Sequence, residues 1–338
     1  MPKKLVTLAL QGGGSHGAFT WGVLDRLLED ERIEIEGISG ASAGAINAAV
    51  LAHGMTTGGR EGGRRALEAF WRSVAPRTPL DFVPGRWHRL NDKAARHPNP
   101  AVNAIMFLTR FFSPYQLNPF NLNPLRDILA SQLDFERLRT DCRIKLFLAA
   151  TRVSTGEPRI FSTEELTLDA LLASACLPSV NRPVEIDGEA YWDGGLTANP
   201  PLRPLLYECE ARDMLMVLLQ PHRRAGTPVT ADEIAQRLSE ISFSSTLASE
   251  LRGISMAKRE AERMVIPMGR LERKLRRLNL HLIDSDDFMS RLSATSKLNT
   301  EAAFIEVLHK EGRSRAAAWL KKNFRHIGER SSFALAAV

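Results

Sequence analysis

The sequence predicts an α/β fold with a mostly parallel central sheet and a helical C-terminal extension. Residues 5–10 form a short apolar run ended by glycines, which is typical of a strand buried on both faces of a parallel sheet. Strand and helix patterns then alternate to residue 51, and parallel strands need such crossover helices. Beyond Pro221, residues 231–264 lack proline and keep an apolar period of three to four residues, which indicates a long helix.

The composition and length are those of a globular protein with one large domain. The chain has 338 residues, a formal net charge of +6, 44% hydrophobic residues and 25% charged residues. These values exclude wholesale disorder, collagen-like repeats and a small disulfide-stapled scaffold. We expect an α/β domain over residues 1–220 and a mainly helical appendage over residues 221–338.

The cysteines and apolar segments favour a cytoplasmic protein. Cys142, Cys176 and Cys209 are odd in number and lack Cys-x-x-Cys spacing, so they predict neither a disulfide framework nor a zinc site. We expect no metal and no cofactor. The run at residues 5–10 is shorter than the core of a signal peptide. The longest near-apolar stretch, residues 40–52, falls below the roughly 18 to 20 residues that span a bilayer.

The predicted elements follow in chain order. After the strand at residues 5–10, the apolar spacing predicts a helix of about four turns behind the glycines at 12–14. Residues 33–38 alternate with period two as a second strand, and residues 43–51 form an Ala-rich helix. Between residues 77 and 124 the pattern dissolves into proline, arginine and aromatic residues. Loops of that length are usually functional or disordered.

Regular patterns resume in the second half of the chain. Asp187-Gly188 separates two short runs, residues 184–186 and 189–192, and is a strong β-hairpin signal. The other predicted elements are helices at residues 125–133, 168–175, 231–264 and 301–324 and strands at residues 144–150, 159–161 and 214–219.

The first motif places a serine where a strand ends and a helix begins. It reads Gly40-Ala41-Ser42-Ala43-Gly44. In a nucleophile elbow the serine occupies a strained turn of this kind, and Gly40 and Gly44 let neighbouring backbone pass close to it. The N-terminus of the following helix favours a developing negative charge. Ser42 is therefore the candidate nucleophile.

The second motif is a glycine-rich turn after the first strand, Gly12-Gly13-Gly14. Residues without side chains let consecutive N–H groups point at one spot and form an anion cradle. Beside a nucleophilic serine this cradle would stabilise an oxyanion, so Gly12, Gly13 and Gly14 are candidate oxyanion-hole residues. The alternative is a dinucleotide-binding turn of the form Gly-x-Gly-x-x-Gly, ending at Gly17, with acidic residues at positions 34 and 36 near the expected offset.

The third motif, Asp193-Gly194-Gly195, follows the second strand of the predicted hairpin. A carboxylate at a strand end is well held, and Gly194 and Gly195 permit a tight turn close to another loop. Asp193 is therefore a candidate general base for a serine on a different strand. An ordinary Asp-Gly-Gly turn is the alternative.

Together the three motifs resemble those of the patatin-like phospholipase family, in order, over about residues 5–219. Further similarities are the stretches at residues 173–178 (ASACLP) and 199–201 (NPP). The resemblance implies a three-layer sandwich around the sheet and a Ser/Asp dyad, with Ser42 as nucleophile, Asp193 as base and the glycine loop as oxyanion hole. It implies a serine lipid acyl hydrolase of phospholipase, lysophospholipase or esterase type, acting on a lipid or acyl ester.

Two positions depart from the family pattern. The family often has Asp before the three glycines and Arg or Lys two residues after them, where this chain has Gln11 and His16. A neutral imidazole at position 16 would weaken the positive charge beside the oxyanion hole.

Other functions stay open at this stage. The same dyad supports an acyltransferase, the glycine turn alone suits a nucleotide-binding protein, and a non-catalytic scaffold is a further alternative. A Ser-Asp-His triad would need a histidine beyond Asp193. The candidates are His222, His281, His309 and His326, and none of them lies at an obvious strand end with glycine neighbours.

The predicted substrate lies at a lipid interface, so we consider whether the protein binds a membrane surface. The basic run at residues 270–277 would attract anionic headgroups, although Glu272 dilutes its field and a solvated helix face is the alternative. We therefore expect a cytoplasmic protein, with peripheral contact at the inner membrane face as one alternative.

Residues 77–115 are the candidate lid or acyl-chain entrance, or irregular packing over the core. We expect no nucleic acid, because the basic run has no aromatic residue to stack bases.

Overall fold

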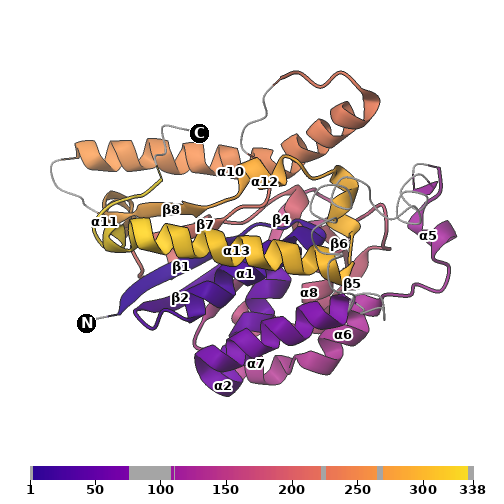
Figure 1. The fold of residues 1–338 in the computed structure, drawn as a ribbon, viewed down its shortest axis with the longest axis horizontal. Coiled ribbons are helices and arrows are strands. Elements are labelled where there is room, and N and C mark those ends of the chain that lie inside the picture. Colours follow the sequence, from indigo (N-terminus) through magenta and orange to yellow (C-terminus); the bar gives the residue numbers. More distant parts are fainter. Residues whose placement is uncertain (1–2, 76–107, 110, 222–225, 265–268, 334–338) are drawn as a thin grey trace.

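The computed structural model describes residues 3–75, 108–109, 111–221, 226–264 and 269–333. Most of the predicted lid and His222 therefore lie outside the described residues. Within this part of the chain, a central sheet lies between two sets of helices (Figure 1). No described helix is both long and apolar enough to cross a bilayer.

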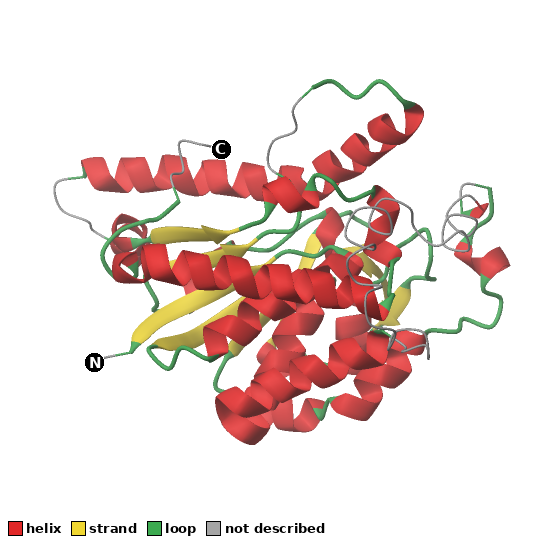
Figure 2. Cartoon of the chain, viewed as in Figure 1, coloured by secondary structure: helices red, strands yellow, loops and turns green. Residues whose placement is uncertain are grey.

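The sheet runs in the order β5-β6-β3-β2-β1-β7-β8, with β4 paired to β3. Figure 2 shows its strands in yellow. Its centre is parallel from β3 through β2, β1 and β7 to β8, while β4, β5 and β6 pair antiparallel. This confirms the mostly parallel sheet and the hairpin. The strands are β1 (Lys4–Leu10), β2 (Ile33–Ala41), β3 (Lys145–Arg152), β4 (Pro158–Ser162), β5 (Val184–Ile186), β6 (Glu189–Asp193), β7 (Asp213–Val217) and β8 (Asn279–Ile283).

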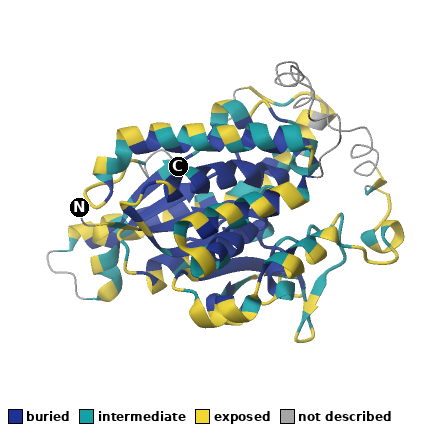
Figure 3. Ribbon diagram, turned by 60° about the horizontal axis from the view of Figure 1, so that its bottom comes forward, coloured by how far each residue is buried: buried dark blue, intermediate teal, exposed yellow. Residues whose placement is uncertain are grey.

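Helices cover both faces of the sheet and make three layers. Along β1, Leu8 and Leu10 belong to a buried cluster with α1, α2 and α13, whereas Ala9 belongs to a cluster with α9, α10 and α11. Burial on both faces explains the continuous apolar run of β1 (Figure 3). The helices are α1 (Gly17–Leu28), α2 (Ala43–Val74), α5 (Pro114–Leu117), α6 (Pro124–Gln132), α7 (Phe135–Asp141), α8 (Leu168–Ser174), α9 (Arg203–Glu208), α10 (Ala231–Arg263), α11 (Arg270–Arg277), α12 (Asp286–Met289) and α13 (Ala302–Asn323).

Two elements differ from the sequence expectations. The helix expected at residues 43–51 is the first part of α2; after the non-helical residues Gly58 and Gly59, a second helical segment runs to Val74 and packs back on the first, with Gly62 against Gly54. Leu67, Phe70 and Trp71 bury this second segment. The C-terminal residues, expected to be mainly helical, also contribute β8, which pairs in parallel along the whole of β7. The division of the chain at residue 220 stays a prediction.

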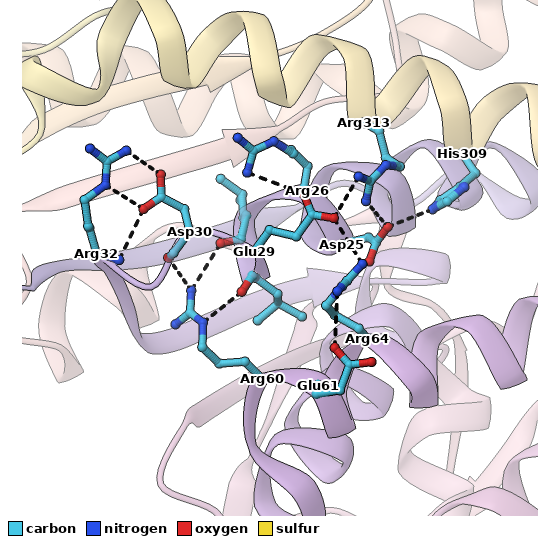
Figure 4. A network of polar contacts seen from close by, with 12 residues as sticks. Asp25, Arg26, Glu29, Asp30, Arg32, Arg60, Glu61, Arg64, His309 and Arg313 are labelled. Carbon is cyan, nitrogen blue, oxygen red and sulfur yellow. Dashed lines mark hydrogen bonds and ion pairs between the residues drawn. The ribbon is translucent and has the colours of Figure 1, made fainter.

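An ion-pair network joins α1, α2 and α13 (Figure 4). Asp25 of α1 accepts a hydrogen bond from Arg64 of α2 at 2.6 Å and pairs with Arg313 of α13, and both arginines also reach Glu29. Burial opposes ionisation of Asp25, but hydrogen bonds from His309, Arg64 and Arg313 hold its pKa well below the usual range. A cavity of about 400 Å³ borders this network and includes none of the predicted site residues.

Candidate active site

Ser42 lies at the junction of β2, which ends at Ala41, and α2, which begins at Ala43. Its φ of 53° and ψ of −127° fall in a region that residues with a Cβ atom rarely adopt. The Ser42 N–H donates to both the carbonyl oxygen and the hydroxyl of Ser174, at 3.1 and 3.0 Å. The C-terminal end of α8 thus holds Ser42 in the strained turn that a nucleophile elbow requires.

Asp193 ends strand β6 and is fully buried. The sheet register brings it to Ser42: Ala41 pairs with Ala149 of β3, and the next residue of β3, Ala150, pairs with Asp193. The Asp193 N–H donates to the carbonyl oxygen of Cys176 at 2.8 Å. The structure therefore brings the two predicted dyad residues together from different strands.

The Asp193 carboxyl group has two unlike oxygens. Oδ1 accepts the Gly195 N–H at 2.7 Å, whereas Oδ2 is buried with no full hydrogen bond from any described residue. Burial raises the pKa of Asp193 to about 6, and the adjacent Ser42 side chain, the Gly195 N–H and the charge of Lys297 limit this rise. The group can therefore exchange a proton near neutral pH.

The glycine loop lies directly against Ser42. A Cβ atom on Gly12 would lie 2.8 Å from the Ser42 Cβ atom, and one on Gly14, where φ is +58°, would clash with the carbonyl oxygen of Lys297. The Gly12 N–H donates to Asn199 Oδ1 at 2.7 Å. The N–H groups of Gly13 and Gly14 have no hydrogen-bond acceptor within the described chain. The loop therefore has two adjacent backbone N–H groups without an acceptor among the described residues.

The supporting glycines all lie at close backbone or ring approaches. A Cβ atom on any of them would overlap a neighbouring atom: Gly40, Gly44, Gly194 and Gly195. Glycine at these positions lets neighbouring segments pack closely, as expected from the sequence for flanking glycines.

The side chains of Gln11 and His16, the two positions that depart from the family pattern, both form buried hydrogen bonds. The Gln11 amide oxygen accepts the N–H groups of Leu219 and Gln220 at 2.7 and 2.9 Å, as a carboxylate would, so the end of β1 stays joined to the chain after β7. His16 is buried with Nε2 2.8 Å from the Ser296 hydroxyl. Burial, together with the charge of Lys297, lowers the pKa of His16 to about 3, so its ring is neutral at neutral pH.

The residues considered for a catalytic triad or a dinucleotide site contact other parts of the fold. The three described histidines beyond Asp193 do not bond the dyad: His281 contacts Asp213 and Ser332, His309 stacks on Trp21 and His326 contacts Arg330. Glu36, considered for a dinucleotide site, accepts the backbone N–H groups of residues 210 and 211. In the described ranges, no group of three or more His, Cys, Asp or Glu side chains is arranged to hold a metal ion.

The comparison with protein families decides the assignment. A family model described as "Patatin-like phospholipase" matches residues 8–206, which is more than half of the chain. The chain belongs to the patatin-like phospholipase family. The fold of this patatin-like chain, a mostly parallel sheet between helices, agrees with that assignment.

Two further comparisons name individual proteins. The "cGAMP-activated phospholipase" of Escherichia coli (strain TW11681) is 28% identical over 217 residues, which cover 57% of this patatin-like chain and 52% of that protein. The chain thus matches about half the length of this curated relative. The crystal structure of VipD from Legionella pneumophila has 17% sequence identity and a TM-score of 0.39, with 92% of this chain and 68% of that chain covered.

Sequence reasoning missed the part of the site that lies beyond Pro221. Phe243 of α10 packs against Gly195, and Ser296 and Lys297 of the 3₁₀ turn η5 (Ala294–Leu298) contact the glycine loop of this patatin-like chain. No local motif marks these residues, because they reach the site only through long-range packing.

Proposed function

We propose that the protein is a serine lipid acyl hydrolase that cleaves ester bonds of phospholipids or related lipids through an acyl-enzyme on Ser42. The observation that carries this proposal is a strained, buried serine beside the buried carboxyl of Asp193. Membership of the patatin-like phospholipase family supports a lipid ester as the substrate class.

The proposed acylation step uses the two unlike oxygens of Asp193. As Ser42 Oγ attacks the ester carbonyl carbon, its proton passes to Oδ2, while the Gly195 N–H holds Oδ1 in place. The tetrahedral intermediate collapses by breaking the bond to the alcohol, which leaves with the proton from Asp193. Water then attacks the acyl-enzyme with Asp193 again as base, which releases the fatty acid and restores Ser42.

The developing oxyanion would be stabilised by the glycine loop. Because the Gly12 N–H is bound to Asn199, the proposed donors are the N–H groups of Gly13 and Gly14, with Gly12 giving the close approach to Ser42. Removing one such donor typically costs about 3 to 4 kcal/mol of transition-state stabilisation. The N-terminus of α2, directly after Ser42, adds a favourable partial positive charge.

The decisive experiment is labelling with a fluorophosphonate probe together with turnover of short-chain esters, long-chain esters and phospholipid vesicles. We expect wild type to label and turn over, and Ser42→Ala and Asp193→Asn to lose both. Ser39→Ala is the matched control, because this buried serine on β2 has no hydrogen-bond partner in the described chain. Each assay is run with and without cGAMP, since the relative is named for activation by that molecule. Activity that survives Ser42→Ala would overturn the proposal.

Acyl transfer is the alternative that shares this mechanism. Adding a series of alcohols to the turnover assay distinguishes the two, because an acyltransferase forms new esters at the expense of free fatty acid. We expect free fatty acid as the main product.

A further inference from the structure

The C-terminal turn η5 packs on the glycine loop. The main-chain carbonyl of Lys297 lies where a Cβ atom on Gly14 would be, and the Ser296 hydroxyl lies 2.8 Å from Nε2 of His16. These contacts join residues from opposite ends of the chain. The position of Lys297 relative to the loop is therefore set by the backbone and not by its flexible side chain.

The Lys297 side chain lies near Phe243, whose ring packs on the Asp193 turn. Its Nζ atom is 5.6 Å from the centre of the Phe243 ring, and that ring contacts Gly195, next to Asp193. The Phe243 carbonyl oxygen accepts a hydrogen bond from Asn199, the residue that binds the Gly12 N–H. No described residue forms an ion pair or hydrogen bond with Nζ. The ammonium is thus held at the site without a paired carboxylate.

The charges that face Lys297 come from three elements. Glu240 of α10 and Asp193 of β6 attract the Lys297 ammonium. Glu240 also forms an ion pair with Arg237, with 3.4 Å between Oε2 and Nη1. His16 of the glycine loop carries no charge at neutral pH. Burial lowers the pKa of Lys297 to about 8, while the charges of Glu240 and Asp193 favour its protonated form. Around pH 7 the Lys297 side chain is therefore largely an ammonium.

We propose that Lys297 is a positioning residue of the active site, whose ammonium supplies the positive charge that His16 does not and keeps the Asp193 carboxylate ionised. A nearby cation favours both a carboxylate and a developing oxyanion. The catalytic consequence rests on the proposed function, whereas the electrostatic effect exists whether or not the protein turns over a lipid.

A thiol titration tests the electrostatic effect without any substrate. In a Ser42→Cys background, the rate of alkylation by iodoacetamide is followed against pH, with mass spectrometry to separate the introduced thiol from Cys142, Cys176 and Cys209. A cation lowers a thiol pKa, so adding Lys297→Met should raise the pKa of the introduced thiol by about one pH unit. Lys297→Arg should restore it, and Lys321→Met, which removes an exposed charge at the end of α13, should leave it unchanged. An equal pKa in the Lys297→Met variant overturns the proposal.

A pH profile then tests the catalytic consequence. In Lys297→Met the acidic fall of kcat/KM should occur at a higher pH than in wild type, and in Lys297→Arg it should occur at the wild-type pH. A purely structural role of Lys297 would not produce this shift. If wild type shows no turnover or labelling, the proposed function fails while the thiol titration still decides the role of Lys297. If turnover is present and the limb stays in place in Lys297→Met, the electrostatic role is excluded.

Discussion

The Gly195 N–H holds one oxygen of the Asp193 carboxyl at 2.7 Å and leaves the other without a full hydrogen bond in the described chain. A carboxylate normally accepts several hydrogen bonds, and each favours its charged form. Asp193 lacks most of them, so burial dominates and its pKa rises to about 6. The same arrangement that makes this carboxylate a better base also makes it a costly group to bury.

Activity should therefore depend on pH in the mildly acidic range. The proposed mechanism needs Asp193 ionised, so kcat/KM should fall about tenfold per pH unit below an apparent pKa near 6. The measurement is kcat/KM for a soluble short-chain ester between about pH 4 and pH 8, with stability checked at each pH. An acidic limb near the ordinary aspartate value would contradict this environment for Asp193.

Asp193→Asn should be inactive and more stable than wild type at neutral pH. Because the folded-state pKa is raised from 3.8 to about 6, the stability from this group is complete below pH 3.8 and is lost as pH rises through about 6. The ionised form then costs about 3 kcal/mol, which the neutral amide avoids. Urea unfolding at pH 7.5 should show the gain, and the difference between the two proteins should shrink at pH 5. Equal stability of both proteins at both pH values would count against a buried charge at this position.

Asp25→Asn should lower stability without changing activity per folded molecule. The variant leaves Arg64 and Arg313 with a neutral partner between α1, α2 and α13, and we expect a loss of about 2 kcal/mol because these arginines are about one-third exposed. The pKa of Asp25 is held below its usual value, so the lost stability is present above about pH 4 and disappears as pH falls.

Thermal and urea unfolding measure this loss. Glu68→Gln is the control, because Glu68 forms an exposed pair with Arg72 on the surface of α2 and should change stability by less than about 0.5 kcal/mol. A loss for Asp25→Asn no larger than that of the control would mean that the network contributes little.

Local patterns predicted the fold and marked the two candidate dyad residues, whereas they did not reveal the long-range contacts. The apolar run of β1, the Ser42 turn and the Asp187-Gly188 hairpin are each encoded within a few residues, so the sequence alone indicates them. Strand β8 is five residues long and is fixed by pairing with β7, and its sequence carries little signal of its own. Lys297 reaches the glycine loop only because η5 folds back onto it.

The contact between Gly14 and Lys297 leads to a last prediction. Gly14 has φ +58°, and a methyl group there would overlap the Lys297 carbonyl oxygen, so Gly14→Ala should cost at least about 2 kcal/mol of stability. It should also displace one proposed oxyanion donor and reduce fluorophosphonate labelling. Gly156→Ala is the matched control: its φ is +71°, nothing lies within 4 Å of the added Cβ atom, and backbone strain alone costs about 1 kcal/mol. Both variants are compared by urea unfolding and by labelling rate under conditions where each is folded. Because Gly14, unlike Gly156, is packed against η5, equal effects of the two substitutions would mean that the strain and not the packing against Lys297 decides the outcome.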